Sequence, residues 1–125
     1  MKFNNINEEK VIETILKSGM EVSRNGNLVI KILANSKDFQ ALDSVYAKKY
    51  ENFLPTVTND TMFVQIIYRY NRVRTIFAHE DGKTPMCSQD FKEGMKVRIE
   101  LKMNTMYKSD EGTGFIWMAH KVIAI

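Results

Sequence analysis

One stretch of the chain alternates strictly between apolar and charged side chains, and this restricts the possible folds more than any other feature. Apolar residues occupy every second position of residues 95–103, and Lys, Arg or Glu occupies each position between them. A period of two is typical of a β-strand with one buried and one exposed face. The chain is therefore expected to form a sheet whose core lies on one side.

Further strands are expected on both sides of this one. Residues 62–70 and 72–78 are dense in β-branched and aromatic side chains, which favour strands. Residues 81–85 have the composition of a loop, and residues 109–114 that of a turn. A last strand is predicted over residues 115–125.

Two helices are predicted in the first half. Asn7 is placed to cap a helix over residues 8–18, in which four apolar residues at helical spacing form a stripe, and Gly19 is placed to end it. A second helix is predicted over residues 37–53, where large apolar residues recur every three or four positions until Pro55.

A hairpin is predicted between the two helices. Asn25 and Gly26 suit the positive φ angles of a type I′ turn, and residues 20–24 and 27–33 are the expected strands. About six strands and two helices in residues 1–125 predict one domain that is mainly β (α+β), as an antiparallel sheet or a small barrel.

Composition is typical of an ordinary folded protein with one core: 44% of the residues are hydrophobic and 26% are charged. No apolar run approaches the ~20 residues that cross a bilayer, so we expect no integral membrane segment. No apolar stretch follows Lys2, and the single Cys87 can form no internal disulfide. These features predict a cytoplasmic location, or the host cytoplasm for a viral protein.

The net charge of +3 lies wholly in the second half of the chain. Residues 1–60 hold eight basic and eight acidic residues, whereas residues 61–125 hold ten basic and seven acidic ones. A basic, β-rich half suggests an anionic partner. The favoured alternative is that so small an excess is ordinary scatter.

The last third of the chain resembles a known family. Residues 91–99 run aromatic, charged, charged, Gly, then Val97 and Ile99, and two further strands follow around Tyr107 to Gly112. This order, over residues 88–125, is similar to the closing half of OB-fold single-stranded DNA-binding proteins. The resemblance implies a small antiparallel OB-like barrel, here with an N-terminal helix and an inserted helix. Glu100, where that family often has Gly, favours a divergent phage, viral or mobile-element type.

The first candidate binding patch combines aromatic and basic side chains at alternate positions: Tyr68, Tyr70, Arg72 and Arg74. On one extended strand they share a face, where rings stack on unpaired bases and guanidinium groups pair with phosphates. The apolar residues at 62, 64 and 66 share that face too. The alternative is therefore that Tyr68 lies in the barrel interior and only the distal end reaches solvent.

Two further patches are expected on the later strands. The charged face of residues 95–103 and the following hairpin contribute four residues: Arg98, Lys102, Tyr107 and Lys108. On the last strand the core face is predicted to hold Ile116, Met118, His120 and Val122. That prediction leaves Phe115 and Trp117 on the outer face as a stacking platform, with a second packed layer as the alternative.

No catalytic or metal site is predicted. Cys87, His79 and His120 lack the spacing of metal ligands, and no histidine is visibly paired with Cys87. The Gly-containing stretch 110–114 is followed by neither the Lys nor the helix of a phosphate-binding loop. We therefore expect neither an enzyme nor a cofactor.

The leading hypothesis is a non-catalytic, largely sequence-independent single-stranded DNA-binding protein of DNA replication or recombination, with RNA as an open alternative. Self-association is expected, because binding along a strand is commonly cooperative. The rival hypothesis is a viral or mobile-element accessory factor that uses the same surface to bind a protein. A hydrolase or nuclease assembled from distant residues is the third and least favoured.

Overall fold

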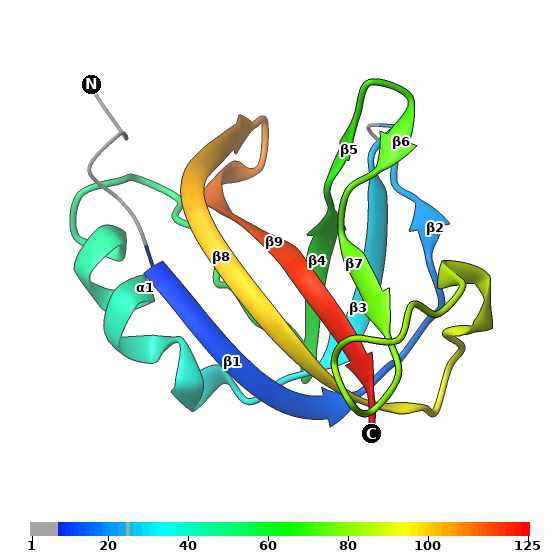
Figure 1. Cartoon of the computed structure of the whole chain (residues 1–125). Coiled ribbons are helices and arrows are strands. Elements are labelled where there is room, and N and C mark those ends of the chain that lie inside the picture. Colours follow the sequence, from blue (N-terminus) through cyan, green and yellow to red (C-terminus); the bar gives the residue numbers. More distant parts are fainter. Residues whose placement is uncertain (1–7, 25) are drawn as a thin grey trace.

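Strands dominate the computed structural model, which describes residues 8–24 and 26–125 (Figure 1). In these ranges the strands are β1 (Glu8–Ile15), β2 (Glu21–Val22), β3 (Leu28–Leu33), β4 (Thr61–Ile66), β5 (Tyr68–Arg69), β6 (Arg72–Val73), β7 (Ile76–Ala78), β8 (Lys96–Ser109) and β9 (Gly112–Ala124). One α-helix, α1 (Gln40–Ala47), and two 3-10 helices, η1 (Ser36–Asp38) and η2 (Ser88–Asp90), complete the described elements. None of the described helices is long and apolar enough to cross a membrane.

The main sheet has the order β1-β8-β9-β4-β3-β2, and β7 also pairs with β9. The β1–β8, β8–β9, β3–β4 and β2–β3 ladders are antiparallel, whereas β4 and β7 each run parallel to β9. β5 and β6 form a separate two-stranded hairpin. The molecule is thus a mainly β fold with a small helical part, which confirms the coarse fold class.

The two ends of the sheet approach each other where β1 ends. Leu16 forms an isolated bridge with Ile32 of β3. The backbone N–H groups of Lys17 and Ser18 both donate to the Lys31 carbonyl, at 2.8 and 3.3 Å. Residues 8–22 therefore pair first with β8 and then with β3. A single bridge does not make a continuous ladder, so the expected closed barrel is not confirmed.

The predicted alternation of residues 95–103 is confirmed in β8. Its inward side chains are at most 2% exposed: Val97, Ile99, Leu101 and Met103. The inward side of β4 is equally buried and comprises Met62, Val64 and Ile66. These two strands face a common core that also holds the Phe39 ring, next to α1.

The predicted N-terminal helix is wrong, because residues 8–15 form β1. Its full length pairs with β8, from Glu8 opposite Met103 to Ile15 opposite Lys96. As a strand, this segment leaves Val11 63% exposed, whereas Leu16 just beyond it is buried. The apolar spacing by itself fits a helix, and pairing with a distant strand overrides this local pattern. Asn7, the expected cap, lies outside the described residues.

The second predicted helix is correct in place but too long. It begins with η1, where the Asn35 side chain accepts a hydrogen bond from the Lys37 N–H at 3.0 Å. α1 ends at Ala47, and the chain then turns through Asn52, whose φ is +55°. Phe53 lies beyond this turn and bridges to β9.

The predicted hairpin of residues 20–33 is confirmed in place as β2 and β3, with Gly26 at φ +84° between them. The predicted two-residue type I′ turn is wrong, because Val22 pairs with Leu28, and a two-residue turn would have paired it with Val29. Asn25, the other predicted turn residue, is outside the described part of the chain. The predicted strands 62–70 and 72–78 are each broken into two shorter ones. Tyr70 and Asn71 have φ values of +54° and +60°, as a type I′ turn requires, so the chain reverses there into β6.

Candidate functional site

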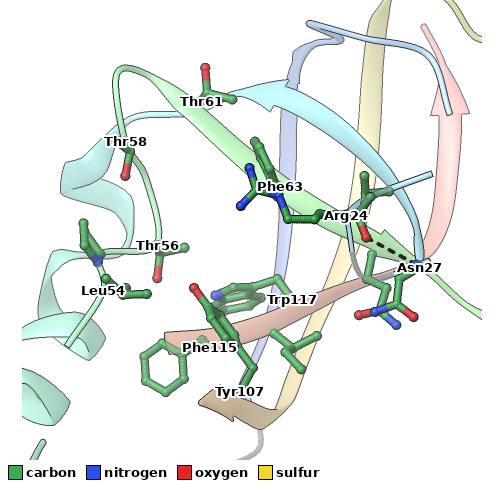
Figure 2. Close-up of a pocket in the computed structure, with 15 residues that line it drawn as sticks. Arg24, Asn27, Leu54, Thr56, Thr58, Thr61, Phe63, Tyr107, Phe115 and Trp117 are labelled. Carbon is green, nitrogen blue, oxygen red and sulfur yellow. Dashed lines mark hydrogen bonds between the residues drawn. The ribbon is translucent and has the colours of Figure 1, made fainter. Parts of the chain in front are cut away.

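A pocket of about 530 Å³ lies between β4, the start of β3, the β8–β9 hairpin and the loop that follows α1 (Figure 2). It exists because β4 and β9 pair over only two positions, Gln65 with Met118 and Ile66 with Ala119. Elsewhere the two strands diverge. The described lining contains one charged side chain, Arg24, among hydroxyl, amide, apolar and aromatic groups.

The loop after α1 forms one rim of this pocket and is held at two points. Leu54 N–H donates to the Thr113 carbonyl at 2.8 Å, which joins the loop to β9. Asp43 of α1 accepts from the Thr56 N–H at 2.9 Å and from the Thr56 hydroxyl at 2.6 Å. The rim is therefore tied to both the sheet and the helix.

Two aromatic rings on the pocket walls reach solvent. Phe63 on β4 is 59% exposed, and Tyr107 on β8 is 39% exposed. Burial, and secondarily the Glu111 carboxylate, raises the pKa of Tyr107 above its ordinary value of 10.0. Tyr107 was predicted as a site residue, whereas Phe63 was missed. The available signal was a large aromatic between the buried positions 62 and 64.

Phe115 and Trp117 also line the pocket, but they are not the exposed platform that the sequence predicted. They are 8% and 2% exposed. The ring centroids of Phe39 and Trp117 are 5.2 Å apart, and those of Tyr46 and Phe115 are 5.0 Å apart. The two rings thus form the inner wall of the pocket and part of the core.

The face assignment of β9 is wrong because the strand contains a bulge. Residues 115, 117 and 119 point to the core, while Ile116 and Met118 are half-buried and His120 is exposed. The register shifts so that Leu101 pairs with Ala119 and Glu100 with Lys121, which leaves His120 as the extra residue. The bulge reverses the alternation, and Val122 is therefore buried, as predicted, on the same side as Trp117.

The Trp117 indole carries an unsatisfied donor at the pocket. Among the described residues, its Nε1 is the one buried side-chain nitrogen or oxygen without a hydrogen-bond partner. Leaving a buried donor unpaired costs about 1–3 kcal/mol. In Figure 2 the indole lies on the pocket floor, with its nitrogen toward the side where Tyr107 and Thr56 lie.

The predicted patch of residues 68–74 forms the β5–β6 hairpin. Tyr68 and Tyr70 are 52% and 86% exposed, so the alternative that Tyr68 lies in the interior is wrong. Tyr68 pairs with Val73, and Arg69 with Arg72, so the four predicted residues do not share one strand face. Arg74 lies over the Tyr70 ring at 5.7 Å. Residues 61–79 include three arginines and no acidic residue.

The β5–β6 and β8–β9 hairpins project at the same end of the sheet, the top in Figure 1. The exposed Lys108 belongs to the latter hairpin, close to Tyr107. The basic hairpin extends directly from β4, whose Gln65 lines the pocket. The structure therefore brings Tyr68, Tyr70, Tyr107 and the pocket toward one end.

Arg98 and Lys102 do not join this surface. They lie on the outer face of β8, where Arg98 is 3.8 Å from the Glu13 carboxylate and Lys102 pairs in register with Glu9. Each of these two cations thus lies opposite a glutamate of β1, whose charge offsets its attraction for phosphate.

In the ranges that the structure describes, no group of three or more His, Cys, Asp or Glu side chains is arranged to hold a metal ion. Comparison with known proteins gives no match to a family model, to a curated protein or to a solved structure.

Proposed function

We propose that the protein binds single-stranded DNA, without catalysis and largely without sequence preference, across the pocket and the β5–β6 hairpin. The observation that carries the proposal is the combination of exposed aromatic rings and arginines at one end of the sheet. Phe63 and Tyr107 stand on the pocket walls, and the hairpin next to β4 belongs to a segment, residues 61–79, that holds three arginines and no acidic residue.

The exposed aromatic rings favour single-stranded over double-stranded DNA as the ligand. Bases stack on aromatic faces only when they are unpaired, and each such contact contributes about 1–3 kcal/mol. Phe63, Tyr107 and Tyr70 offer three rings, and Arg72 and Arg74 supply charge for the phosphates between the bases. Arg98 and Lys102 are left out of the proposed surface because acidic side chains lie beside them.

We also propose that the fold is OB-like and that it closes through the bridge between Leu16 and Ile32. Counting residues 8–22 as the first strand makes β3, β4, β8 and β9 the second to fifth. OB-folds bind oligonucleotides on the face of the second and third strands, between the loops that connect strands one to two and four to five. The pocket has the corresponding position, since Arg24, Phe63 and Tyr107 come from those elements.

One observation supports the rival hypothesis of a protein-binding module. The described pocket lining has a single charged side chain, Arg24, and a largely apolar and aromatic inner wall. Apolar pockets with aromatic anchors also bind peptides. The two functions differ in their response to salt, because only nucleic-acid binding releases counterions from phosphates.

The test is a fluorescence anisotropy titration with labelled oligo-dT at two salt concentrations that differ fourfold. About three phosphate contacts on a single strand predict a slope near −2 in log–log form and hence about a 20-fold loss of affinity. A duplex of the same length should bind more weakly, and cooperative binding would indicate the expected self-association. Absence of binding at low salt rejects the proposal, and tight binding without salt dependence favours the rival.

A further inference from the structure

The pocket holds a hydrogen-bond donor with no acceptor in the described protein. Trp117 Nε1 is buried without a partner, and Trp117 lines the pocket between β4 and β9 (Figure 2). Buried donors are almost always paired with protein or ordered water. An unpaired one at a pocket wall points to an acceptor supplied by a ligand.

The core fixes the direction in which this donor points. Trp117 is 2% exposed, and the Phe39 ring meets it edge to face at a centroid distance of 5.2 Å. The indole therefore cannot turn to reach an acceptor elsewhere. Of the hydroxyls that also line the pocket, that of Thr56 donates to Asp43 and that of Thr61 accepts from Lys17, and neither accepts from the indole N–H.

We infer that the pocket takes one base of the bound strand and that Trp117 Nε1–H donates a hydrogen bond to a carbonyl oxygen on the edge of that base. This inference rests on the proposed function and adds to it one position that is recognised by hydrogen bonding as well as by stacking. The volume of about 530 Å³ lies in the range of roughly 300–1,000 Å³ that is usual for small-ligand pockets.

The base enters beside Tyr107, because the indole nitrogen is covered in the unbound protein. Tyr107 is the half-exposed side chain that Figure 2 shows on the nitrogen side of the indole. Its ring packs over Gly114, where a Cβ atom would lie 2.9 Å from the ring. Outward rotation of the ring opens a path and leaves the ring free to stack on the inserted base.

The first experiment follows the indole N–H by NMR in the intact chain. Trp117 is the single tryptophan, so one indole resonance reports on this nitrogen alone. On addition of oligo-dT the proton is expected to shift downfield and its exchange with solvent to slow at least tenfold. A strand whose thymines are replaced by difluorotoluene, which keeps the shape but is a much weaker acceptor, should produce neither change.

The second experiment measures the affinities of the wild-type chain and of two variants for these two strands. The wild-type chain should prefer the thymine strand by about fivefold, the effect of one hydrogen bond. Trp117→Phe keeps an aromatic ring in the core but removes the N–H, and this preference should disappear. The matched control, Phe63→Leu, should weaken binding of both strands while keeping their ratio.

The outcomes separate the two proposals. If oligo-dT binds but the indole resonance does not move, or the wild-type chain does not distinguish the two strands, the base-insertion site is wrong and the proposed function stands. If oligo-dT does not bind at all, both are wrong. If Trp117→Phe does not fold, the NMR comparison on the wild-type chain still decides.

Discussion

The ring of Tyr107 rests against the backbone of Gly114, its partner across the β8–β9 ladder. A Cβ atom at Gly114 would lie 2.9 Å from Tyr107 Cε1 and 2.9 Å from its hydroxyl oxygen. An aromatic ring over a cross-strand glycine is a recurring way to fill the space that the glycine leaves. This contact sets the position of the ring on the pocket wall.

Gly114→Ala is expected to push the Tyr107 ring toward solvent. Crowding should cost about 1–2 kcal/mol of unfolding free energy. Lost burial should bring the pKa of Tyr107 back toward 10.0, since burial is the main cause of its raised value. A phenolate absorbance titration measures this pKa, and Tyr107→Phe identifies the transition. An unchanged titration in Gly114→Ala would contradict the contact.

Gly112→Ala is expected to destabilise the protein far more than an ordinary glycine substitution. Gly112 has φ +150°, and a Cβ there would lie 1.9 Å from the Asn52 carbonyl oxygen, a backbone atom. Strain and clash together should cost about 3 kcal/mol or more. Gly94→Ala is the control, because Gly94 also has a positive φ but open space around it, and it should cost about 1 kcal/mol. Denaturant unfolding measures both variants, and equal losses of unfolding free energy in Gly112→Ala and Gly94→Ala would contradict the clash.

The double variant Arg72→Ala/Arg74→Ala is expected to weaken oligo-dT binding about 10-fold at low salt. Its log–log salt slope should fall by about 1.4, because two phosphate contacts are lost. Arg98→Gln/Lys102→Gln removes the same formal charge from the outer face of β8 and should change the slope little. Equal effects of the two variants in anisotropy titrations would place the binding surface elsewhere.

Phe63→Ala is expected to weaken oligo-dT binding by about 10-fold through the loss of one stacked base. Because Phe63 is 59% exposed, its removal should cost little stability. Ile76→Ala is the matched control, since Ile76 is 53% exposed on β7 and does not line the pocket. Unaltered affinity in Phe63→Ala would exclude this ring from the interface.

Asp81 is expected to make the 79–85 loop sensitive to acid. Its carboxylate accepts from the Thr84 hydroxyl at 2.6 Å, the Thr84 N–H at 2.8 Å and the Lys83 N–H at 2.9 Å. These bonds, the hydroxyl foremost, lower the pKa of Asp81 from 3.8 to about 2. A lowered pKa stabilises the fold above about pH 4, and this contribution disappears as the pH falls through about 2.

Thermal unfolding of the wild type and Asp81→Ala over this pH range measures the effect. The difference in midpoint should be constant above about pH 4 and should shrink toward zero near pH 2. A difference that does not change with pH would show that the carboxylate charge is not what stabilises the loop.

Sequence reasoning succeeded where local pattern and tertiary environment agree. The alternation in residues 96–103 requires one buried face, and β8 has it. The turn chemistry near Gly26 marked the β2–β3 hairpin. For β1 the pattern was ambiguous, because apolar positions 11, 12, 15 and 16 fit a helix. Only the ladder with β8, which lies far along the chain, makes it a strand.

The site was harder to predict than the fold. A bulge or turn that shifts the inward–outward alternation of a strand by one residue decides which side chains are exposed. The bulge at His120 placed Trp117 in the core rather than on the surface. The turn at Tyr70 and Asn71 moved Tyr68 and Arg72 onto different faces of a hairpin. The pocket itself depends on the divergence of β4 from β9, which no local pattern encodes.

The pairing of β1 with β8 has a consequence for how the chain folds. Glu8 and Met103 are partners although about three-quarters of the chain lies between them. Loop closure of that length must come before the ladder forms, which predicts folding in milliseconds to seconds rather than microseconds. During synthesis, β1 has no β8 to pair with until the last third of the chain has been made. Until then its outward Val11 and Ile15 belong to an unpaired segment, and a chain interrupted before residue 96 has no route to this fold.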